Sequence, residues 1–272
     1  MTVGIVGVGL IGGSVAQALS AQKQSLWLDD RDPATKQALS RLRLGRVDSY
    51  VRWAGGVDTV VLAVPLQEMT RIIYDIVPRM RSTATLIDLS SVKGPVAEAL
   101  RWAGQSVQVL SLHLMAGREV SGFTAASPDL FRDCAAAVVD IGLGSGPADA
   151  IAWWQQVLGC APFGLWSAYE HDRAMAWVSQ LPYLASRAVA QVVQAQAPQT
   201  MALAGSGFRD TTRVGKTALS EVLPMLSHNA EELSRALLAL ESELRVWRQC
   251  LDRSVSAAVP LESLDGCLKP NE

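Results

Sequence analysis

One histidine stands where acid–base chemistry is expected. The chain has three histidines in 272 residues, and His113 comes where the apolar run VQVLSL (107–112) gives way to a glycine-containing loop. In an open parallel sheet, ligands gather beside the carboxyl ends of the strands. A histidine at that edge can accept the proton of a hydroxyl group that is being oxidised. The alternative is a structural histidine that hydrogen-bonds the loop.

Two other apolar runs end in residues expected at the same edge. Ser90 and Ser91 follow ATLIDL (84–89), and Pro65 follows DTVVLAV. A hydroxyl group beside a histidine at the nicotinamide end suits alcohol oxidation, in which hydride passes to the cofactor and the imidazole accepts the proton. We therefore expect the serines and Pro65 to border the cofactor.

A glycine-rich turn near the start of the chain indicates a dinucleotide site. Gly7, Gly9 and Gly12, with Leu10 and Ile11 before the last glycine, form a G-x-G-x-x-G sequence between a short apolar run and a helical stretch. The three glycines allow, in order, a tight turn, a close approach to the pyrophosphate and close packing of helix on sheet. The helix N-terminus adds N–H donors for the phosphates. These five residues are expected to bind the cofactor; a merely structural turn is the alternative.

The end of the second expected strand carries acidic residues. Asp30 lies 18 residues after Gly12, close to the usual position of the acid that binds the adenosine ribose. A carboxylate there repels a 2′-phosphate and favours NAD. Arg31 can stack on adenine or pair with a 2′-phosphate, so NADP is the alternative cofactor. Asp29 is the alternative acid if the strand ends one residue earlier.

Apolar runs alternate with helical segments through the first part of the chain. This alternation predicts a parallel sheet covered by helices on both faces. A helix is expected to open at Pro33, and another to cover 148–158. The expected strands are 3–6, 25–28, 58–64, 84–89, 107–112, 135–141 and 163–166.

Strands then disappear from the pattern. Ser167 and Glu170 have the spacing of a capping box, and they open a long helix in which Pro182 should cause a kink or an opened turn. The last clear helix has leucines and a tryptophan at alternating spacings of four and three, which is an a/d seam. This spacing supports two interpretations equally: the helix packs on its own domain, or it forms the seam between two copies in a dimer. The seam positions are Leu233, Leu237, Leu240, Leu244, Trp247 and Leu251.

The predicted fold class is α/β, with an N-terminal Rossmann dinucleotide-binding domain and a C-terminal all-helical domain. The expected boundaries are 1–166 for the Rossmann domain, 167–253 for the helical substrate and dimerisation domain, and 254–272 for a loosely held tail. The helical domain is expected to make a homodimer.

Composition excludes several function classes. Hydrophobic residues make up 49% and charged residues 18%, with a net charge of −2, so we expect a compact protein with no nucleic-acid partner. The first 22 residues are uncharged but glycine-rich, unlike a signal peptide or a membrane span. The four cysteines are far apart and read as reduced thiols. We expect a cytoplasmic protein with no membrane partner and no metal site, since no cluster has metal-ligand spacing.

Four segments resemble successive motifs of the prephenate/arogenate dehydrogenase family of tyrosine biosynthesis. They are LIDLSSVKG (86–94), HLMAGREVSG (113–122), HDRAMAWVSQLP (171–182) and GSGFRDTTRVG (205–215). The likeness looks closest to the short cyanobacterial-type arogenate dehydrogenases. It implies an NAD(P)-dependent oxidoreductase that converts arogenate to tyrosine or prephenate to 4-hydroxyphenylpyruvate, with loss of carbon dioxide.

The resemblance also implies residue roles. His113 would contact the ring hydroxyl that is oxidised, and Ser91 would orient nicotinamide and hydroxyl. Arg213 would bind a substrate carboxylate through two parallel hydrogen bonds, in a cleft between the domains. Gln180 stands where many relatives have histidine, and it would hydrogen-bond the substrate carboxylate or its keto or amino group.

The other residues of these motifs have plainer expected roles. His171 and Asp172 are expected to make a helix-start or interdomain hydrogen bond, and His228 to be structural or at the surface. Lys93 is a weak candidate for contact with cofactor or substrate, or a solvated residue at a helix start.

Two other functions fit parts of the pattern. One is another Rossmann dehydrogenase with a helical second domain, of the β-hydroxyacid or imine-reducing type, but the lysine motifs of those enzymes are missing. The other is a non-catalytic nucleotide-sensing regulator, which would have no use for a substrate arginine.

Overall fold

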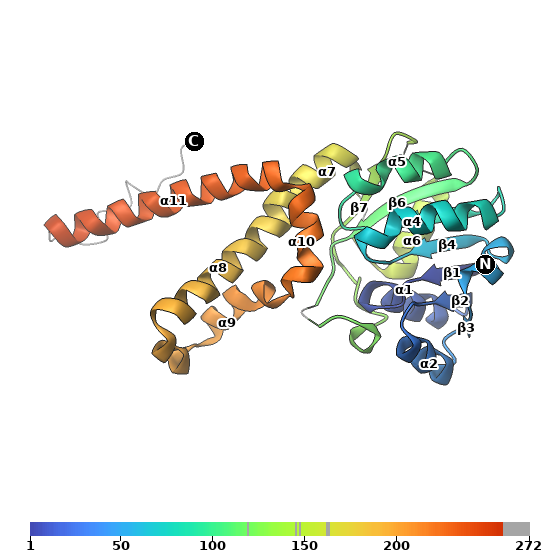
Figure 1. The fold of residues 1–272 in the computed structure, drawn as a ribbon, viewed down its shortest axis with the longest axis horizontal. Coiled ribbons are helices and arrows are strands. Elements are labelled where there is room, and N and C mark those ends of the chain that lie inside the picture. Colours follow the sequence, from blue (N-terminus) through green and yellow to red (C-terminus); the bar gives the residue numbers. More distant parts are fainter. Residues whose placement is uncertain (119, 145, 147, 162–163, 258–272) are drawn as a thin grey trace.

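The computed structural model describes residues 1–118, 120–144, 146, 148–161 and 164–257. A sheet domain holds the first part of the chain, and an elongated group of helices projects from it (Figure 1). The helical region begins at the end of the last strand. No helix of the described residues is long and apolar enough to cross a membrane.

The sheet has eight strands in the order β3-β2-β1-β4-β5-β6-β7-β8. The first six in this order are parallel, and β1 lies at the centre of the reversal in strand order, so the carboxyl ends of β1 and β4 open a crevice there. The strands are β1 (Thr2–Val6), β2 (Ser25–Asp29), β3 (Arg46–Val47), β4 (Thr59–Leu62), β5 (Thr85–Asp88), β6 (Gln108–Leu114), β7 (Ala136–Asp140) and β8 (Gly164–Ser167).

Two strands, β7 and β8, run against the predicted direction. The sequence pattern predicted a parallel sheet throughout, but β7 is antiparallel to β6, and β8 is parallel to β7. Among the described residues between β6 and β7, the one helical element is the short 3-10 turn η3 (Phe123–Ala125), and no crossover helix is present. A parallel pair needs such a crossover, so the chain returns antiparallel.

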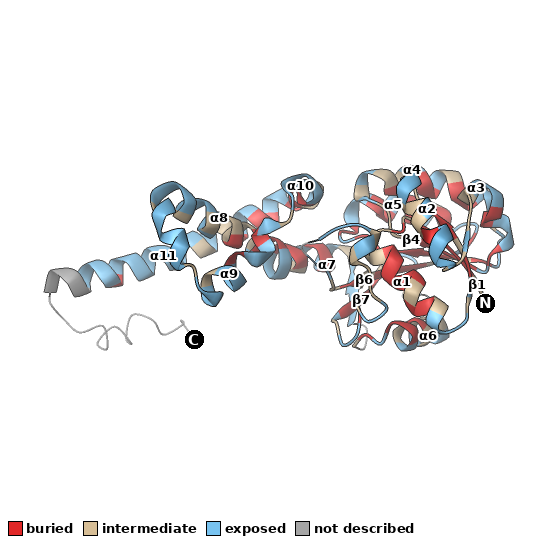
Figure 2. Cartoon of the chain, turned by 90° about the horizontal axis from the view of Figure 1, so that it is seen from below, coloured by how far each residue is buried: buried red, intermediate tan, exposed pale blue. Residues whose placement is uncertain are grey.

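Helices cover both faces of the sheet, as predicted. One buried cluster joins the sheet to α1 (Leu10–Ala21), α2 (Pro33–Leu42) and α6 (Ala148–Leu158). A second joins the opposite face to α3 (Tyr50–Trp53), α4 (Leu66–Ile76) and α5 (Gly94–Ala103). Figure 2 shows buried residues concentrated where these layers meet. The strand side chains are mostly apolar and buried, because both sheet faces are covered.

The helical region has a smaller buried cluster. Its helices are α7 (Ala168–Met175), α8 (Leu181–Gln196), α9 (Ser206–Arg213), α10 (Leu219–His228) and α11 (Ala230–Ala257). Short 3-10 turns connect elements along the chain: η1 (Ala54–Gly56), η2 (Val77–Arg79), η5 (Pro198–Leu203) and η6 (Val214–Lys216).

The predicted effect of Pro182 is confirmed. The capping box of Ser167 and Glu170 starts α7, and a π-helical turn, η4 (Ala176–Gln180), separates α7 from α8. Proline has no N–H to donate to the carbonyl four residues earlier, and its ring crowds that carbonyl. The helix widens at this point instead of ending.

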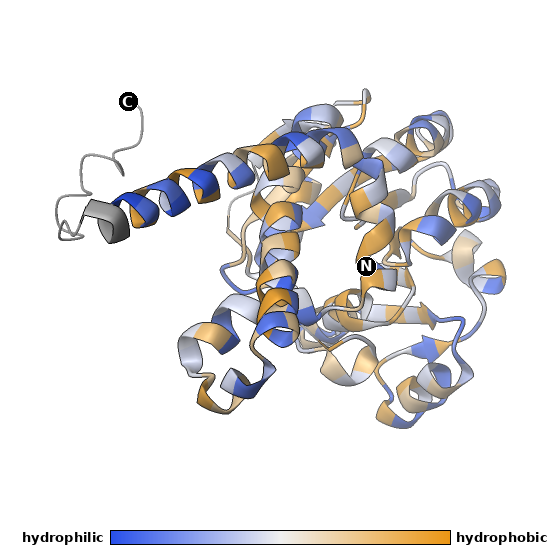
Figure 3. Cartoon of the chain, turned by 60° about the vertical axis from the view of Figure 1, so that its left-hand side comes forward, coloured by the Kyte–Doolittle hydropathy of each residue, from blue (hydrophilic) through white to orange (hydrophobic). Residues whose placement is uncertain are grey.

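The seam on α11 divides into two parts. Leu233 is buried in the helical cluster and Leu237 packs against it. Leu244, Trp247 and Leu251 are 59%, 50% and 49% exposed. Apolar and polar residues alternate along this projecting helix (Figure 3). The first half of the helix therefore packs on its own domain, and a dimer seam along the exposed half stays a prediction.

Cys134 and Cys160 are free thiols. Burial raises the pKa of the Cys160 thiol to about 11, which keeps it unreactive. Helix α11 continues to Ala257 and so includes residues 254–257 of the expected tail; residues 258–272 of that tail lie outside the described part of the chain.

Candidate active site

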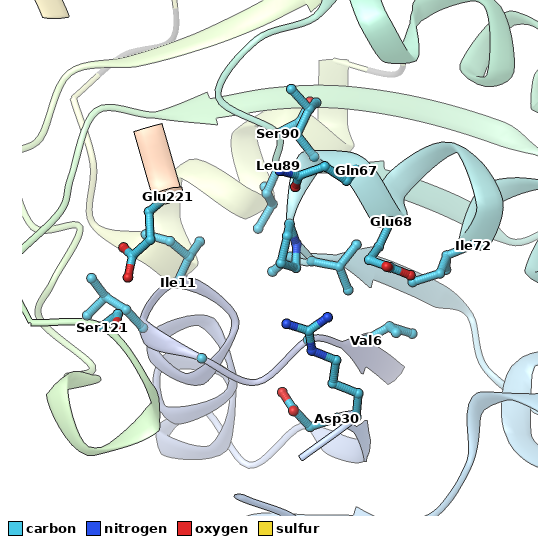
Figure 4. Close-up of a pocket in the computed structure, with 18 of the residues that line it drawn as sticks. Val6, Ile11, Asp30, Gln67, Glu68, Ile72, Leu89, Ser90, Ser121 and Glu221 are labelled. Carbon is cyan, nitrogen blue, oxygen red and sulfur yellow. The ribbon is translucent and has the colours of Figure 1, made fainter. Parts of the chain in front are cut away.

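A cavity of about 980 Å³ opens at the carboxyl ends of β1, β2, β4 and β5 and is bordered by α10. Figure 4 shows Asp30 at one end, Ser90 at the other, and Glu221 of α10 beside Ile11. Eight of the residues predicted to bind cofactor line it: Gly7, Gly9, Leu10, Ile11, Asp30, Arg31, Pro65 and Ser91. Gly12 is buried behind them.

The glycine loop has the geometry needed for a pyrophosphate. Gly7 has φ +84°, a left-handed conformation that favours glycine. A Cβ on Gly12 would lie 1.9 Å from the Gly7 carbonyl oxygen, whereas a Cβ on Gly9 would meet nothing within 4 Å. Gly9 therefore faces open space, and no side chain caps the start of α1. Unpaired N–H groups of the helix remain available to an anion.

The acidic residues after β2 have separate roles. Asp29 ends the strand and is 7% exposed; its carboxylate accepts from the Tyr50 N–H at 2.9 Å and pairs with Lys36 at 2.7 Å. Asp30 accepts from the Val8 N–H at 2.7 Å, which ties it to the glycine loop, and from the Asp32 N–H at 2.9 Å. A carboxylate offers about four lone-pair sites, so Asp30 keeps acceptor capacity toward the cavity.

The two serines after β5 also differ. Ser90 is buried; its hydroxyl donates to the Val92 carbonyl at 3.0 Å, and its N–H donates to Asp88 at 2.8 Å. Ser91 is exposed and lines the cavity. Ser90 therefore holds the loop, and Ser91 is the serine with a free approach to a ligand.

Lys93 was interpreted wrongly from the sequence. It is neither solvated nor in the cavity: its side chain is fully buried, and Nζ donates to Asp88 and to the Leu112 carbonyl, both at 2.8 Å. Ser111 donates to the same Asp88 oxygen at 2.8 Å. Burial lowers the pKa of Lys93, although Asp88 opposes that change. Lys93 is therefore a structural residue, and its contacts link β5 and β6 to the start of α5.

His113 lies inside a strand and not just beyond one. The antiparallel ladder with β7 extends β6 to Leu114 and pairs His113 with Ala137. Its half-buried ring contacts His171 of α7, with His113 Nδ1 2.8 Å from His171 Nε2. The two rings meet edge to face, with centroids 5.0 Å apart. His113 is not among the residues that line the cofactor cavity.

The carboxylate of Asp172 contacts four groups next to the His113–His171 pair. Asp172 lies 2.8 Å from His171 Nδ1 and 3.1 Å from His228 Nε2. It also accepts from the N–H of Lys93 at 2.8 Å and of Gly94 at 2.8 Å. The interdomain hydrogen bond expected of Asp172 is confirmed, because Lys93 and Gly94 belong to the sheet domain.

The charges of this network shift two pKa values. Burial lowers the pKa of His113 well below its ordinary value, and the charges of Lys93 and His171 lower it further, while Asp172 opposes them. Burial would raise the pKa of Asp172, but hydrogen bonds from His171, Gly94 and Lys93 outweigh burial and lower it. At neutral pH the network holds a neutral His113 and an ionised Asp172.

The expected substrate residues are not brought to the cavity. Gln180 ends the π-helical turn and is 4% exposed, and its Oε1 has no hydrogen-bond partner among the described residues. Arg213 ends α9, exposed, and α9 packs on α8 and on η6. In Figure 1, α9 lies beside the end of α8 that is far from the sheet domain.

Residue patterns did not identify His171 and His228 as neighbours of His113. The available signal was scarcity, because all three histidines of the chain belong to one network: His171 and His228 contact Asp172, and His113 contacts His171. The adjacent pair His171-Asp172 in the third family-like motif was a second signal.

Comparisons with known proteins agree with the resemblance. The family model described as the prephenate dehydrogenase nucleotide-binding domain matches residues 15–141, and the model of its dimerization domain matches residues 167–256. The cyclohexadienyl dehydrogenase of Zymomonas mobilis is 27% identical over 267 residues, covering 89% of each chain.

Solved structures give the same picture. Synechocystis arogenate dehydrogenase is similar with a TM-score of 0.74 and 26% identity, over 98% of both chains. Prephenate dehydrogenase from Aquifex aeolicus, in complex with hydroxyphenyl propionate and NAD+, shares the fold with a TM-score of 0.81 at 22% identity, over 94% of this chain and 92% of that one. The two family matches together span most of the residues from 15 to 256, and the chain belongs to the prephenate dehydrogenase family of oxidoreductases.

Proposed function

We propose that this chain catalyses the NAD-dependent oxidative decarboxylation of arogenate or prephenate. The observation that carries the proposal is the meeting of the glycine loop and Ser91 on one cavity, beside the strand that bears His113. A dinucleotide in this cavity would extend from Asp30 to Ser91.

The cavity suits NAD. Uncapped N–H groups of α1 face the pyrophosphate position, and Gly9 leaves room for it. Asp30 would accept from the ribose hydroxyls and repel a 2′-phosphate; Arg31, also in the cavity, is the residue that would favour NADP. Pro65 would border the nicotinamide end. The solved relative from A. aeolicus is a complex with NAD+, which supports the same cofactor here.

The residues then divide the chemistry. NAD+ supplies the hydride acceptor. His113 would accept the proton of the ring hydroxyl as the carbon loses hydride, and Ser91 would hold hydroxyl and nicotinamide in register. The carbonyl formed draws the electron pair of the breaking carbon–carboxylate bond into the ring, which becomes aromatic as carbon dioxide leaves.

Arg213 requires a second copy of the chain to act on substrate. Arg213 is not among the residues that line the cofactor cavity of its own chain, and residues 167–256 match a dimerization domain. We assign Arg213 of each copy to the substrate carboxylate in the site of the other, within a homodimer made by the helical region. Gln180, whose Oε1 lacks a partner among the described residues, would hydrogen-bond the substrate side chain.

A mixing experiment tests this assignment. His113→Asn and Arg213→Ala chains are each expected to be inactive alone. Unfolded and refolded together, they should regain about a quarter of wild-type activity, because half the dimers would be mixed and one of their two sites would have both residues intact. No recovery, with mixed dimers demonstrated, would place Arg213 in its own chain's site or outside catalysis.

The reaction itself is tested by the formation of reduced nicotinamide in a two-by-two grid of prephenate or arogenate against NAD+ or NADP+. Turnover in the NAD+ cells supports the cofactor assignment, and the better substrate identifies the preference. Turnover in no cell, with cofactor binding intact, overturns the proposed function. The domain boundaries 1–166 and 167–253 and the cytoplasmic location stay predictions.

A further inference from the structure

His113, His171 and Asp172 form a directed hydrogen-bond chain at the catalytic position. An ionised carboxylate only accepts, so Asp172 requires His171 to carry its proton on Nδ1. When His171 is neutral, its Nε2 accepts, and its partner at 2.8 Å, His113 Nδ1, is the donor. The lone pair of His113 is thereby left on Nε2, free for a substrate hydroxyl.

Asp172 is held so that it remains an anion. Its two oxygens take the N–H groups of Lys93 and Gly94 at the start of α5, and the Asn229 side chain donates to its carbonyl at 2.8 Å. Gly94 is needed for this approach, because a Cβ there would lie 2.5 Å from His228 Nε2 and 3.3 Å from Asp172 Oδ2. Backbone donors cannot be lost by titration, so the carboxylate keeps its charge near neutral pH.

The proposed reaction needs a place to keep one proton temporarily. Oxidation breaks the O–H bond of the ring hydroxyl and forms an N–H bond at His113 Nε2. Loss of carbon dioxide then delivers an electron pair to the ring, and the carbonyl oxygen becomes a phenolate that takes one proton back. The proton taken from the hydroxyl is thus returned to the phenolate, and none is released to solvent. The enzyme therefore holds this proton only between oxidation of the hydroxyl and protonation of the phenolate.

We propose that His171 is a positioning residue that shares this proton with His113: as the hydroxyl proton reaches His113 Nε2, the Nδ1 proton of His113 moves to His171 Nε2, beside the Asp172 carboxylate. The return to the phenolate reverses both transfers. This inference rests on the proposed function. It gives the His171-Asp172 pair the role that the carboxylate has in a catalytic triad, with one more imidazole between carboxylate and base.

The surrounding charges favour the proton on His171 over His113. His113 faces the buried ammonium of Lys93, whereas His171 faces Asp172. Beyond Asp172 lies His228 at the end of α10, on a second cavity of about 430 Å³ whose other charged side chains include Arg173, Glu232 and Arg235. Lys93 is itself paired with Asp88. A proton on His171 is therefore the better neutralised of the two.

The first test replaces His171 by glutamine, which keeps a polar group near the Nε2 position but cannot take up a proton. His171→Gln is expected to lower kcat roughly 10-fold or more, to leave KM within about threefold, and to move the acidic limb of the kcat/KM profile to lower pH, because His113 alone must then hold the proton. Arg173→Gln, on the same helix and with a half-exposed side chain paired to Glu232, is the matched control and should leave all three unchanged. An unchanged kcat, a loss confined to KM, or a limb that stays or moves to higher pH would overturn the proposal.

A second measurement on the wild-type holoenzyme avoids any folding failure of the variant. With three histidines, nitrogen-15 NMR resolves each ring, and neutral His113 and His171 should both carry the proton on Nδ1. A His113 proton on Nε2 would overturn the proposal. This measurement does not depend on turnover, so failure of the substrate grid and failure of the proton-sharing pair are distinguishable.

Discussion

The sheet domain and the helical region bury their apolar side chains to different extents. The sheet is covered on both faces by helices whose apolar residues are almost fully buried. The helical region has one small cluster, and most of the large exposed apolar side chains belong to it, including Val192, Leu238 and Trp247. A surface of that kind is typical of an interaction site. The first domain buries its apolar residues within one chain, whereas we expect a second copy of the chain to cover the exposed apolar face of the second.

The largest expected effect separates chemistry from cofactor binding within this comparison. His113→Asn should lower kcat about 10²- to 10⁴-fold, because a general base is removed. The cavity that binds the dinucleotide is lined by other residues, so the dissociation constant for NADH, measured by fluorescence, should stay within about twofold. Wild-type turnover by the variant would remove His113 from the mechanism.

The next effect compares one apolar residue from each region. Ile87 of β5 is 0% exposed and Leu244 of α11 is 59% exposed. Ile87→Ala should lower the free energy of unfolding by about 2–5 kcal/mol, through lost burial and a cavity. Leu244→Ala should change it by less than about 0.5 kcal/mol in dilute protein. In urea titrations, the Leu244 cost should grow with protein concentration, because the wild-type dimer is stabilised by mass action.

Equal and concentration-independent costs at the two positions would break the comparison. The helical region would then bury Leu244 within one chain.

The third effect concerns assembly alone. Trp247→Glu with Leu251→Glu places charges on the exposed half of the α11 seam and should raise the dimer dissociation constant about 100-fold or more. Sedimentation at micromolar concentration would then show monomers. Gln249→Glu adds the same type of charge off the seam on the same helix and should leave the dimer intact. A wild-type chain that is already monomeric at that concentration would remove the seam hypothesis.

The two regions also differ in how far the sequence predicted them. The glycine loop, the Pro182 interruption and all strand segments except the two-residue β3 follow from local spacing, and they are where the pattern predicted them. The direction of β7 and the burial of Lys93 depend on contacts between distant segments, such as Lys93 with Asp88 and with the Leu112 carbonyl. Local periodicity carries no information about such pairs.

The site shows the same limit. Residues 7–12 and 30–31 were predicted because a glycine-rich turn and an acidic residue at the end of the second strand are local patterns typical of a dinucleotide site. The contact of His113 with His171 joins residues 58 positions apart, and it depends on how α7 docks on α5 and β6. The position of α9, and with it Arg213, depends on packing within the helical region and is invisible in a single motif.

The smallest effect lies at the junction of the two regions and depends on pH. Burial and the charges of Lys93 and His171 hold the pKa of His113 well below its ordinary value in the folded chain, whereas the unfolded chain has a value of about 6.5. Above pH 6.5 neither state binds this proton, and the full stability is present. As pH falls below 6.5, only the unfolded state binds it, so stability is lost until the folded pKa is reached, by no more than about 1.4 kcal/mol for each pH unit. Between pH 7.5 and 5.5, His113→Asn should therefore lose less free energy of unfolding than the wild type, while Arg173→Gln should lose as much; equal losses in all three chains would mean that His113 titrates normally and that the junction does not hold it neutral.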